Sequence, residues 1–293
     1  MSITKGALYV VATPIGNLAD MTTRGTEVLA AVDLIAAEDT RHSAPLLRHF
    51  SINTPCQALH EHNEKAICAR IIARLQSGES VALISDAGTP LVSDPGYHLV
   101  SAAHECSLPI IPIPGACALI TALSASGLPT NRFSYEGFLP AKSSARKRHL
   151  ETLADDPRTL VFYEAPHRIK ASLADMQEVF GGGRVAVLGR ELTKRFETIR
   201  RDSLAELLSW VEADPNQQKG EIVVLVHGAA KEAQSTETAE GERVLRLLLA
   251  ELPLKQAVSL TTTITGGKRN ALYRSAMVIN NEDSACTDQA GPD

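Results

Sequence analysis

Two short polar segments of this chain carry side chains that could move a proton or hold a charged ligand. Residues 38–42 (EDTRH) follow the apolar run 34–37, and residues 60–64 (HEHNE) precede an amphipathic stretch. A carboxylate or imidazole can take a proton from a weak nucleophile, and an arginine can bind a phosphate. The histidines of the second segment are two apart rather than four, which argues against an HExxH zinc site. An Asp–Arg ion pair and helix capping are the structural alternatives.

Residues 81–96 (VALISDAGTPLVSDPG) are the stretch around which the chain is organised. Four apolar residues predict a buried strand, and the turn-forming residues after them predict a loop at its carboxyl end. Ligands of open α/β sheets bind at that edge, and Gly88 would let a ligand approach the backbone. We interpret this loop as part of a binding site. A tight turn of an ordinary α/β protein is the alternative.

Similar turns follow two other predicted strands, at residues 13–18 (TPIGNL) and 114–119 (PGACAL). The first of these is not a GxGxxG or Walker-type loop, so neither a dinucleotide nor a nucleoside-triphosphate site is supported there. None of the three turns contains lysine or arginine. Together they predict a crevice for a neutral or zwitterionic cofactor rather than a polyphosphate.

The composition limits the class of protein. The chain has 293 residues, 44% hydrophobic, which suggests roughly two domains. A formal charge of -5 argues against a surface built wholly for nucleic acid. The five cysteines show no CxxC pair, so we expect reduced thiols, no metal site and a cytoplasmic location.

Neither a secretion signal nor a membrane span is predicted. The first residues of the chain do not form the apolar core of a signal peptide, and prolines interrupt the uncharged segment within residues 105–132.

The second half of the chain again alternates strands with polar strand ends, and it contains the densest basic cluster. Residues 142–149 (KSSARKRH) open a predicted helix, where the helix dipole disfavours cations. We interpret the cluster as a contact to RNA phosphates, with a solvated helix start as the alternative.

Near the end of the chain, a Gly turn followed by a basic helix resembles a helix-turn-helix unit. Packing or a dimer contact would explain that geometry equally well.

The expected organisation has five parts. They are an N-terminal α/β domain (1–128), a C-terminal α/β domain (129–230), a linker (231–241), a small helical domain (242–279) and a disordered tail (280–293).

Eight ordered motifs together resemble one family, the bacterial ribosomal RNA small-subunit methyltransferase I, of the tetrapyrrole-methylase-like class of S-adenosylmethionine enzymes. They are residues 8–18 (LYVVATPIGNL), 38–41 (EDTR), 60–64 (HEHNE), 85–90 (SDAGTP), 114–116 (PGA), 162–168 (FYEAPHR), 191–194 (ELTK) and 219–221 (KGE). The resemblance covers about residues 7–226 and the helical end. It implies 2′-O-methylation of a cytidine ribose in 16S rRNA, by a homodimer whose cofactor lies between two α/β domains.

The resemblance also implies roles for individual residues. The cofactor crevice would be formed, mostly through backbone, by Pro14, Gly16, Asp86, Ala87, Gly88, Thr89, Gly115, Ala116, Tyr163, Glu164 and Gly220. Separately from the resemblance, the clustering of Asp39, Arg41 and His62 at polar strand or helix ends leads us to expect them over the methyl group, with Asp39 or His62 as the base and Arg41 on a phosphate. The expected RNA contacts are Lys142, Arg146, Lys147, Arg148, Lys268 and Arg269.

The chain departs from the family pattern at two positions that bear on function. Residues 13–17 (TPIGN) replace the glycine-rich first loop of the tetrapyrrole enzymes, which argues against a porphyrin-precursor substrate. Cys117 stands where the family commonly has serine. Two other functions stay open at this point: a small-molecule methylase of the same fold, and a non-enzymatic RNA-binding assembly factor.

Overall fold

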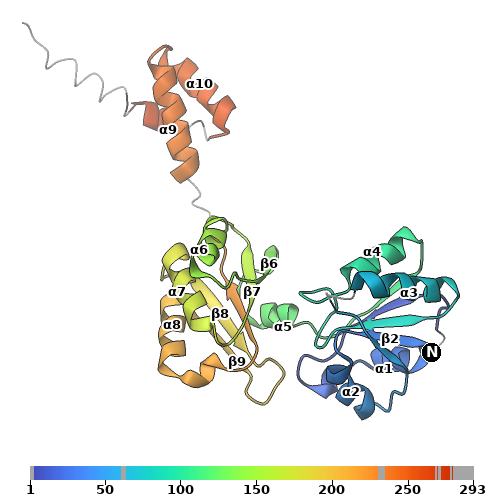
Figure 1. Ribbon diagram of the computed structural model, residues 1–293. Coiled ribbons are helices and arrows are strands. Elements are labelled where there is room, and N and C mark those ends of the chain that lie inside the picture. The colour runs from blue at the N-terminus through green and yellow to red at the C-terminus, as the bar shows by residue number, and fades with distance from the viewer. Residues whose placement is uncertain are drawn as a thin grey trace, which may run out of the picture. The chain divides into compact units, whose positions relative to one another are not determined.

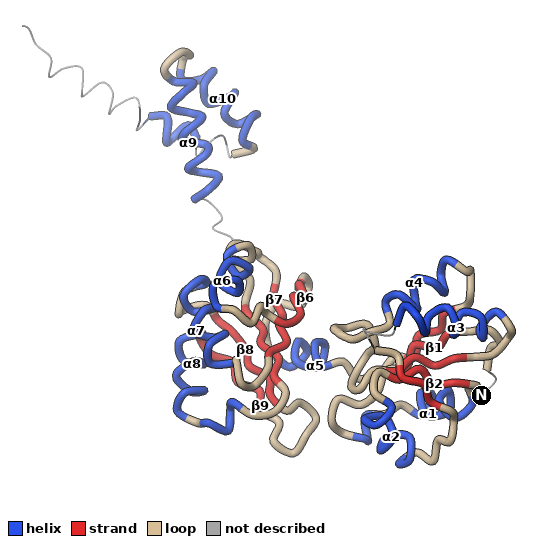
Figure 2. The backbone as a smooth tube through the Cα atoms, viewed as in Figure 1, coloured by secondary structure: helices blue, strands red, loops and turns tan. Residues whose placement is uncertain are grey.

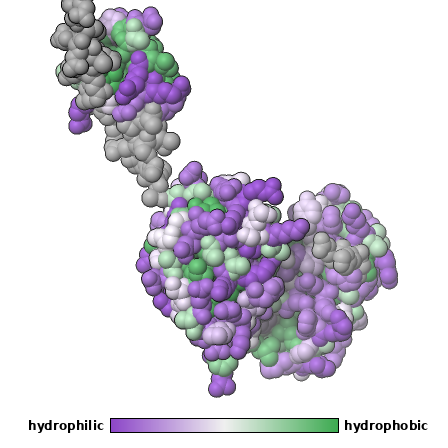
Figure 3. Space-filling view, turned by 60° about the vertical axis from the view of Figure 1, so that its left-hand side comes forward, coloured by the Kyte–Doolittle hydropathy of each residue, from purple (hydrophilic) through white to green (hydrophobic). Residues whose placement is uncertain are grey.

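The computed structural model describes residues 3–60, 64–229, 235–267, 269, 272–277 and 279. The chain forms two compact units, one ending at Gly228 and the other starting at Ala229 (Figure 1). The first unit contains two five-stranded sheets, and Figure 2 shows their strands as two separate groups. No described helix is long and apolar enough to cross a membrane, and hydrophilic side chains cover much of the face seen in Figure 3.

The first sheet is wholly parallel, with the order β3-β2-β4-β1-β5. Its strands are β1 (Leu8–Val11), β2 (Leu34–Ala37), β3 (Cys56–Ala58), β4 (Val81–Ile84) and β5 (Ile110–Ile113). The central strands β1, β2 and β4 are almost wholly buried, which explains their uninterrupted apolar sequences. Parallel pairing places all five carboxyl ends at one edge, so the loops after β1, β4 and β5 come together there.

Helices cover both faces of this sheet. Side chains of α1 (Thr23–Ala31) and α2 (Thr40–His49) pack on one face, and those of α3 (Glu64–Gln76) and α4 (Tyr97–Glu105) on the other. The 3₁₀ helix η1 (Leu18–Asp20) follows the first strand-end loop.

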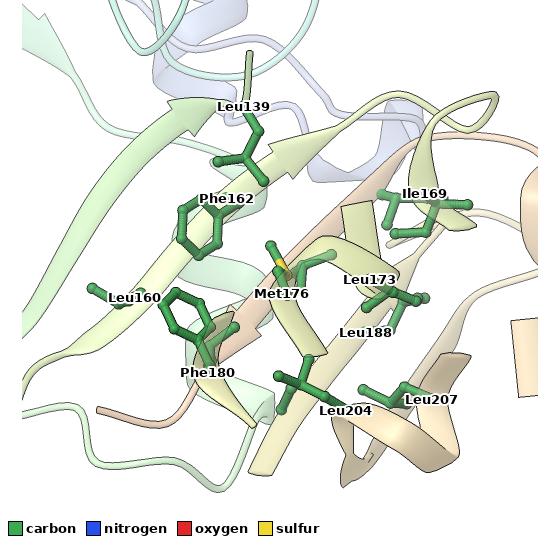
Figure 4. Close-up of a cluster of buried hydrophobic side chains, with 14 of the residues drawn as sticks. Leu139, Leu160, Phe162, Ile169, Leu173, Met176, Phe180, Leu188, Leu204 and Leu207 are labelled. Atoms are coloured by element: carbon green, nitrogen blue, oxygen red, sulfur yellow. The ribbon is translucent and has the colours of Figure 1, made fainter. Parts of the chain in front are cut away.

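The second sheet is mixed, with the order β6-β7-β10-β8-β9, and only β6 and β7 are parallel. Its strands are β6 (Phe133–Phe138), β7 (Thr159–Glu164), β8 (Val185–Arg190), β9 (Thr198–Ser203) and β10 (Ile222–Val226). One face carries the core shown in Figure 4, to which α6 (Ser143–Glu151), α7 (Ile169–Phe180) and α8 (Leu204–Ala213) contribute. The short helix η2 (Pro215–Gln218) precedes β10.

The other face of the second sheet packs against parts of the first half of the chain. Val161, Val187 and Val223 of the sheet lie in one buried cluster with Leu119 of α5 (Ala118–Ala125) and with Ile15. Ile15 belongs to the loop after β1, so this cluster joins the loop edge of the first sheet to one face of the second.

The second unit is helical and has a small core of its own. Leu245 of α9 (Ser235–Leu249) packs with Ala257 and Val258 of α10 (Leu254–Thr265) and with Leu272 and Ala276 beyond it. Gly266 follows the last residue of α10 and caps the helix with a left-handed backbone (φ 71°), which favours glycine.

The predicted linker over residues 231–241 is wrong in its second part, because α9 already begins at Ser235. Glutamate and alanine are strong helix formers, and a polar composition is shared by exposed helices and linkers. The predicted boundary at residue 128 falls between α5 and β6 and stays a prediction. The predicted tail, 280–293, lies outside the described residues.

Four further elements were not expected from the sequence: β3, α2, β9 and α8. Strand β9 (TIRRDS) lies at the sheet edge, where charged side chains are tolerated and protect against further pairing. Helix α2 contains Pro45, which obscures its helical pattern.

Candidate active site

A pocket of about 390 Å³ lies where the loops of the first sheet meet the second sheet. The first sheet's loops supply Ile15, Ala87, Gly88, Thr89, Val92, Ser93 and Asp94, and the start of α5 supplies Cys117 and Ala118. The second half supplies Phe138, Tyr163, Glu164, Ala165, Pro166, Leu192, Glu221, Ile222 and Val223. This volume is typical of sites for small organic ligands.

The loops of the first sheet are held together by hydrogen bonds. Thr13 and Gly88 exchange two backbone hydrogen bonds, with N···O distances of 2.9 and 3.0 Å. The hydroxyl of Thr89 donates to the carbonyl of Ala116 at 3.0 Å, which ties the loop after β4 to the loop after β5. Gly88 has φ 83°, and a Cβ there would lie 3.2 Å from Cγ2 of Ile15. The loop wall therefore presents mainly backbone.

The opposite wall is built from side chains. Tyr163 lies on β7, and its hydroxyl accepts a 3.1 Å hydrogen bond from the backbone N–H of Leu119. Burial raises the pKa of this hydroxyl, so it stays protonated near neutral pH. Tyr135 and Phe138 of β6 contact the Tyr163 ring at centroid distances of 5.0 and 5.7 Å.

The pocket is acidic. Its described lining includes three carboxylates, Asp94, Glu164 and Glu221, and no lysine, arginine or histidine. The Glu164 carboxylate is turned into the second half, where it accepts hydrogen bonds from Ser172 and Arg168. Glu221 is likewise paired outside the lining, with Lys194 at 3.1 Å. Among the described carboxylates of the lining, Asp94 has no ion-pair partner within 4 Å, so it supplies most of the uncompensated negative charge. This field favours a ligand with positive charge.

Asp94 combines a place in the pocket wall with an altered acidity. Burial, together with the negative charges of Glu38 and Asp86, raises its pKa to about 6. Leu91 and Ser93, on either side of Val92, have φ of 72° and 66°, a conformation rarely adopted by non-glycine residues. Strained backbone of this kind is concentrated at functional sites.

The predicted base Asp39 lies outside the pocket lining. It caps α2, and its carboxylate accepts two hydrogen bonds from the Arg41 side chain at 2.7 and 3.1 Å. Hydrogen bonding to Arg41 holds the pKa of Asp39 well below its usual range, which makes this carboxylate a weak base. The Asp–Arg pair considered as an alternative is therefore formed. The other predicted base, His62, lies outside the described residues.

Asp86 links this polar cluster to the central loop. Its Oδ1 accepts the N–H of Asp39 at 3.1 Å, and its Oδ2 lies 2.9 Å from Nδ1 of His42. Asp86 thus positions the start of α2, and it is absent from the pocket lining.

The other predicted cofactor residues fall into two groups. Ala87, Gly88, Thr89, Tyr163 and Glu164 line the pocket, whereas Pro14, Gly16, Asp86, Gly115, Ala116 and Gly220 do not. Each of these six except Gly115 is adjacent in sequence to a lining residue. Two of the glycines allow close packing of the loops. A Cβ on Gly115 would lie 2.8 Å from Cβ of Ala12, and one on Gly220 would collide with the Glu191 side chain. Their role is to shape the surroundings of the pocket.

Sequence reasoning missed Asp94, Phe138 and Glu221 as lining residues. The signal for Asp94 was present in the turn formers of residues 93–96, which follow the same strand as the predicted loop. Nothing in the sequence alone distinguishes Phe138 from a core residue, because its orientation depends on an irregularity in β6.

The basic cluster of α6 differs from the prediction at one central position. Arg146 is 2% exposed, and its Nε donates to Asp175 of α7 at 2.7 Å, so it is a structural residue rather than an RNA contact. Lys147 pairs with Glu178 at 2.6 Å, while Lys142 and Arg148 are exposed. In the second unit Arg269 is exposed, and Lys268 lies outside the described residues.

Comparison with known proteins places this geometry in a family. Residues 7–208 match the family described as Tetrapyrrole (Corrin/Porphyrin) Methylases, and residues 235–279 match the RsmI C-terminal HTH domain. Two proteins named Ribosomal RNA small subunit methyltransferase I are similar throughout. The one from Pseudomonas aeruginosa is 60% identical over 93% of this chain and 97% of its own length, and that of Escherichia coli O157:H7 is 54% identical over 93% and 95%.

Solved structures support the fold. A uroporphyrin-III-C-methyltransferase from Thermus thermophilus has a TM-score of 0.53 at 20% identity, covering 76% of this chain and 94% of its own. A diphthine synthase has a TM-score of 0.57 at 15% identity, covering 75% and 90%. The predicted fold class, two α/β parts of the tetrapyrrole-methylase type with a helical end, is confirmed. The chain belongs to the ribosomal RNA small subunit methyltransferase I family of the tetrapyrrole methylases.

Proposed function

We propose that this protein transfers a methyl group from S-adenosylmethionine to the ribose 2′-oxygen of a cytidine in 16S rRNA. The observation that carries the proposal is the pocket itself, in which a backbone wall faces an aromatic wall and the described lining contains carboxylates but no basic side chain. The names of the relatives supply the class of reaction and the RNA substrate.

The lining fits S-adenosylmethionine, which supplies a methyl group attached to a positively charged sulfonium. The carboxylates favour that positive charge, and the absence of basic groups from the described lining disfavours polyphosphates. Residues 87–89 and the start of α5 would hold the cofactor through backbone groups. Because these loops are already joined by hydrogen bonds, less conformational entropy is lost on binding.

The residue best placed to act as the base is Asp94. A ribose hydroxyl is a weak nucleophile, and a positioned base contributes roughly 10²–10⁴-fold to the rate of such a reaction. When bound, S-adenosylmethionine would supply the methyl group by cleavage of its S–CH3 bond, leaving S-adenosylhomocysteine, and the Asp94 carboxylate would take the proton of the ribose hydroxyl that receives the methyl group. A pKa of about 6 leaves Asp94 mostly ionised at pH 7 and more basic than an ordinary aspartate. The earlier hypothesis of Asp39 as the base is disfavoured by its pairing with Arg41.

The expected contacts with RNA stay proposals. The exposed guanidinium of Arg41, with Lys142 and Arg148 of the first unit and Arg269 of the second, would contact phosphates. We also propose a homodimer that acts in the cytoplasm on 16S rRNA within the small ribosomal subunit.

Two measurements test the function. Calorimetric titration of the purified protein with S-adenosylmethionine should show binding in the absence of RNA. Incubation with radiolabelled cofactor and unmethylated small subunits should then label 16S rRNA at a cytidine, and 2′-O-methylation should make the adjacent phosphodiester resistant to alkali. Cofactor binding without transfer to RNA would favour a small-molecule methylase, and RNA binding without cofactor binding would favour an assembly factor.

A further inference from the structure

An irregularity in β6 decides which face of the second sheet carries Phe138. Tyr135 pairs with Val161 of β7, but the next pair joins Gly137 to Phe162, and Phe138 is paired with Tyr163. One residue of β6, Glu136, is therefore extra between two successive pairs. Gly137 has φ 66°, a conformation that a β-bulge often requires.

The bulge turns Phe138 towards the pocket. Successive side chains of a strand point to opposite faces, so a shift of one residue exchanges the faces of all that follow. On β7, Phe162 belongs to the buried core, whereas Val161 and Tyr163 belong to the face that bears the pocket. Without the bulge Phe138 would pair with Glu164 and face that core. With it, Phe138 shares the face of Tyr163 and lines the pocket.

Phe138 is held in place and yet remains accessible. Its ring contacts Tyr163 edge-on, with the centroids 5.7 Å apart. The hydroxyls of Tyr135 and Ser93 lie 2.6 Å apart, which ties the same aromatic group to the loop that carries Asp94. Even so, Phe138 is 53% exposed. A rigid aromatic ring at the edge of a pocket, with more than half of its surface open, is suited to stacking on a planar group that arrives from solvent.

We propose that Phe138 is a stacking platform for the base of the RNA nucleotide that receives the methyl group. This inference rests on the proposed function. Proteins recognise unpaired RNA bases largely by stacking them on aromatic side chains. A base held on Phe138 would place its ribose at the pocket, near the carboxylate of Asp94. The adenine of the cofactor is the competing partner for the ring, and the test below separates the two partners by the affinity that each would lose.

The first test compares Phe138→Ala with Phe133→Ala, since Phe133 is an exposed phenylalanine of the same strand outside the pocket lining. Removal of a stacking aromatic weakens nucleic-acid binding by roughly 5- to 150-fold. We expect a loss of that size in the affinity for unmethylated small subunits with Phe138→Ala, restoration with Phe138→Trp, and little change with Phe133→Ala. The affinity for S-adenosylmethionine, measured by calorimetry, should fall much less than the affinity for subunits with Phe138→Ala, and should be unchanged with Phe133→Ala.

The outcomes separate this inference from the proposed function. If the unaltered protein does not methylate small subunits, the proposed function itself fails. If it does and Phe138→Ala binds subunits normally, the platform is refuted. An equal loss of cofactor affinity would instead assign the ring to adenine and overturn the inference.

A second test asks whether the base itself is the partner. Small subunits are reconstituted with 16S rRNA that has an abasic nucleotide at the methylated position, and binding is measured with the unaltered protein and with Phe138→Ala. If ring and base stack, each change alone weakens binding, and the two together weaken it little more than either one. Independent, multiplicative losses would show that the ring contacts something else.

Discussion

The two sheets contribute to the pocket in different ways. The parallel first sheet supplies the loops that follow its strands, where backbone hydrogen bonds and glycine set the shape. The mixed second sheet supplies strand residues: Tyr163 and Val223 contribute side chains from one face, whereas the side chain of Ile222 belongs to the core on the other face. A wall of backbone tolerates changes of side chain but not of backbone conformation, whereas a wall of side chains depends on each residue and on the core behind it.

The largest effect is expected from Asp94, the one side chain of the loop wall to which we assign chemistry. Asp94→Asn keeps the shape but cannot accept the proton, and kcat should fall roughly 10²–10⁴-fold. Asp39→Asn should have a much smaller effect. Single-turnover methylation with saturating cofactor measures both. Equal losses in the two variants would return the role of base to the cluster around Asp39.

The pH dependence sharpens the same assignment. Asp94 must be ionised to act as the base, so kcat should fall about tenfold per pH unit below its pKa of about 6. The raised pKa also means that the folded chain binds more protons than the unfolded chain between about pH 4 and 6. Protonation of Asp94 therefore adds to the free energy of unfolding at pH values below that window, and this stabilisation is lost as the pH rises through it. Asp94→Asn should remove both effects.

The stability of the second half of the chain, which supplies the side-chain wall of the pocket, should depend on the ion pair between Arg146 and Asp175. Arg146 and Asp175 are almost completely buried, and leaving one partner of such a pair alone costs about 3–5 kcal/mol. Arg146→Met should therefore lower the free energy of unfolding in urea, and adding Asp175→Leu should restore much of it. Arg148→Ala, in the exposed part of α6, is the control and should leave stability unchanged. A stable Arg146→Met protein with weakened RNA binding would restore the original hypothesis for this residue.

The loop wall is tested by two glycines with similar backbone. Gly88 (φ 83°) lines the pocket, and Gly78 (φ 94°) lies in a turn with no atom within 4 Å of an added Cβ. Alanine at either position should cost about 1–3 kcal/mol of stability. Only Gly88→Ala should also weaken binding of S-adenosylmethionine, as measured by calorimetry. Equal cofactor affinities in the two variants would argue against this loop as the binding wall.

The smallest effect is expected at the exposed cations. Arg148→Ala should reduce the slope of log K against log salt for RNA binding by about one, with the cofactor affinity unchanged. An unaltered slope would remove Arg148 from the RNA contacts.

The sequence was informative about the first wall for a physical reason. Buried parallel strands form uninterrupted apolar runs, and the Gly and Pro residues after them mark loops, so the loops after β1, β4 and β5 could be found from composition. The second wall depends on pairing between strands. The orientation of Phe138 is set by one extra residue in β6, and the burial of Arg146 is set by Asp175 of another helix. Neither relation is local in sequence.

The paired hydrogen bonds between Thr13 and Gly88 have a consequence for motion. Each residue both donates to and accepts from the other, so neither loop can open without releasing both bonds. The amide protons of these two residues should therefore exchange with solvent together, and more slowly than those of exposed neighbours such as Asn17. The loops after β1 and β4, although far apart in the chain, then behave as one cooperative unit.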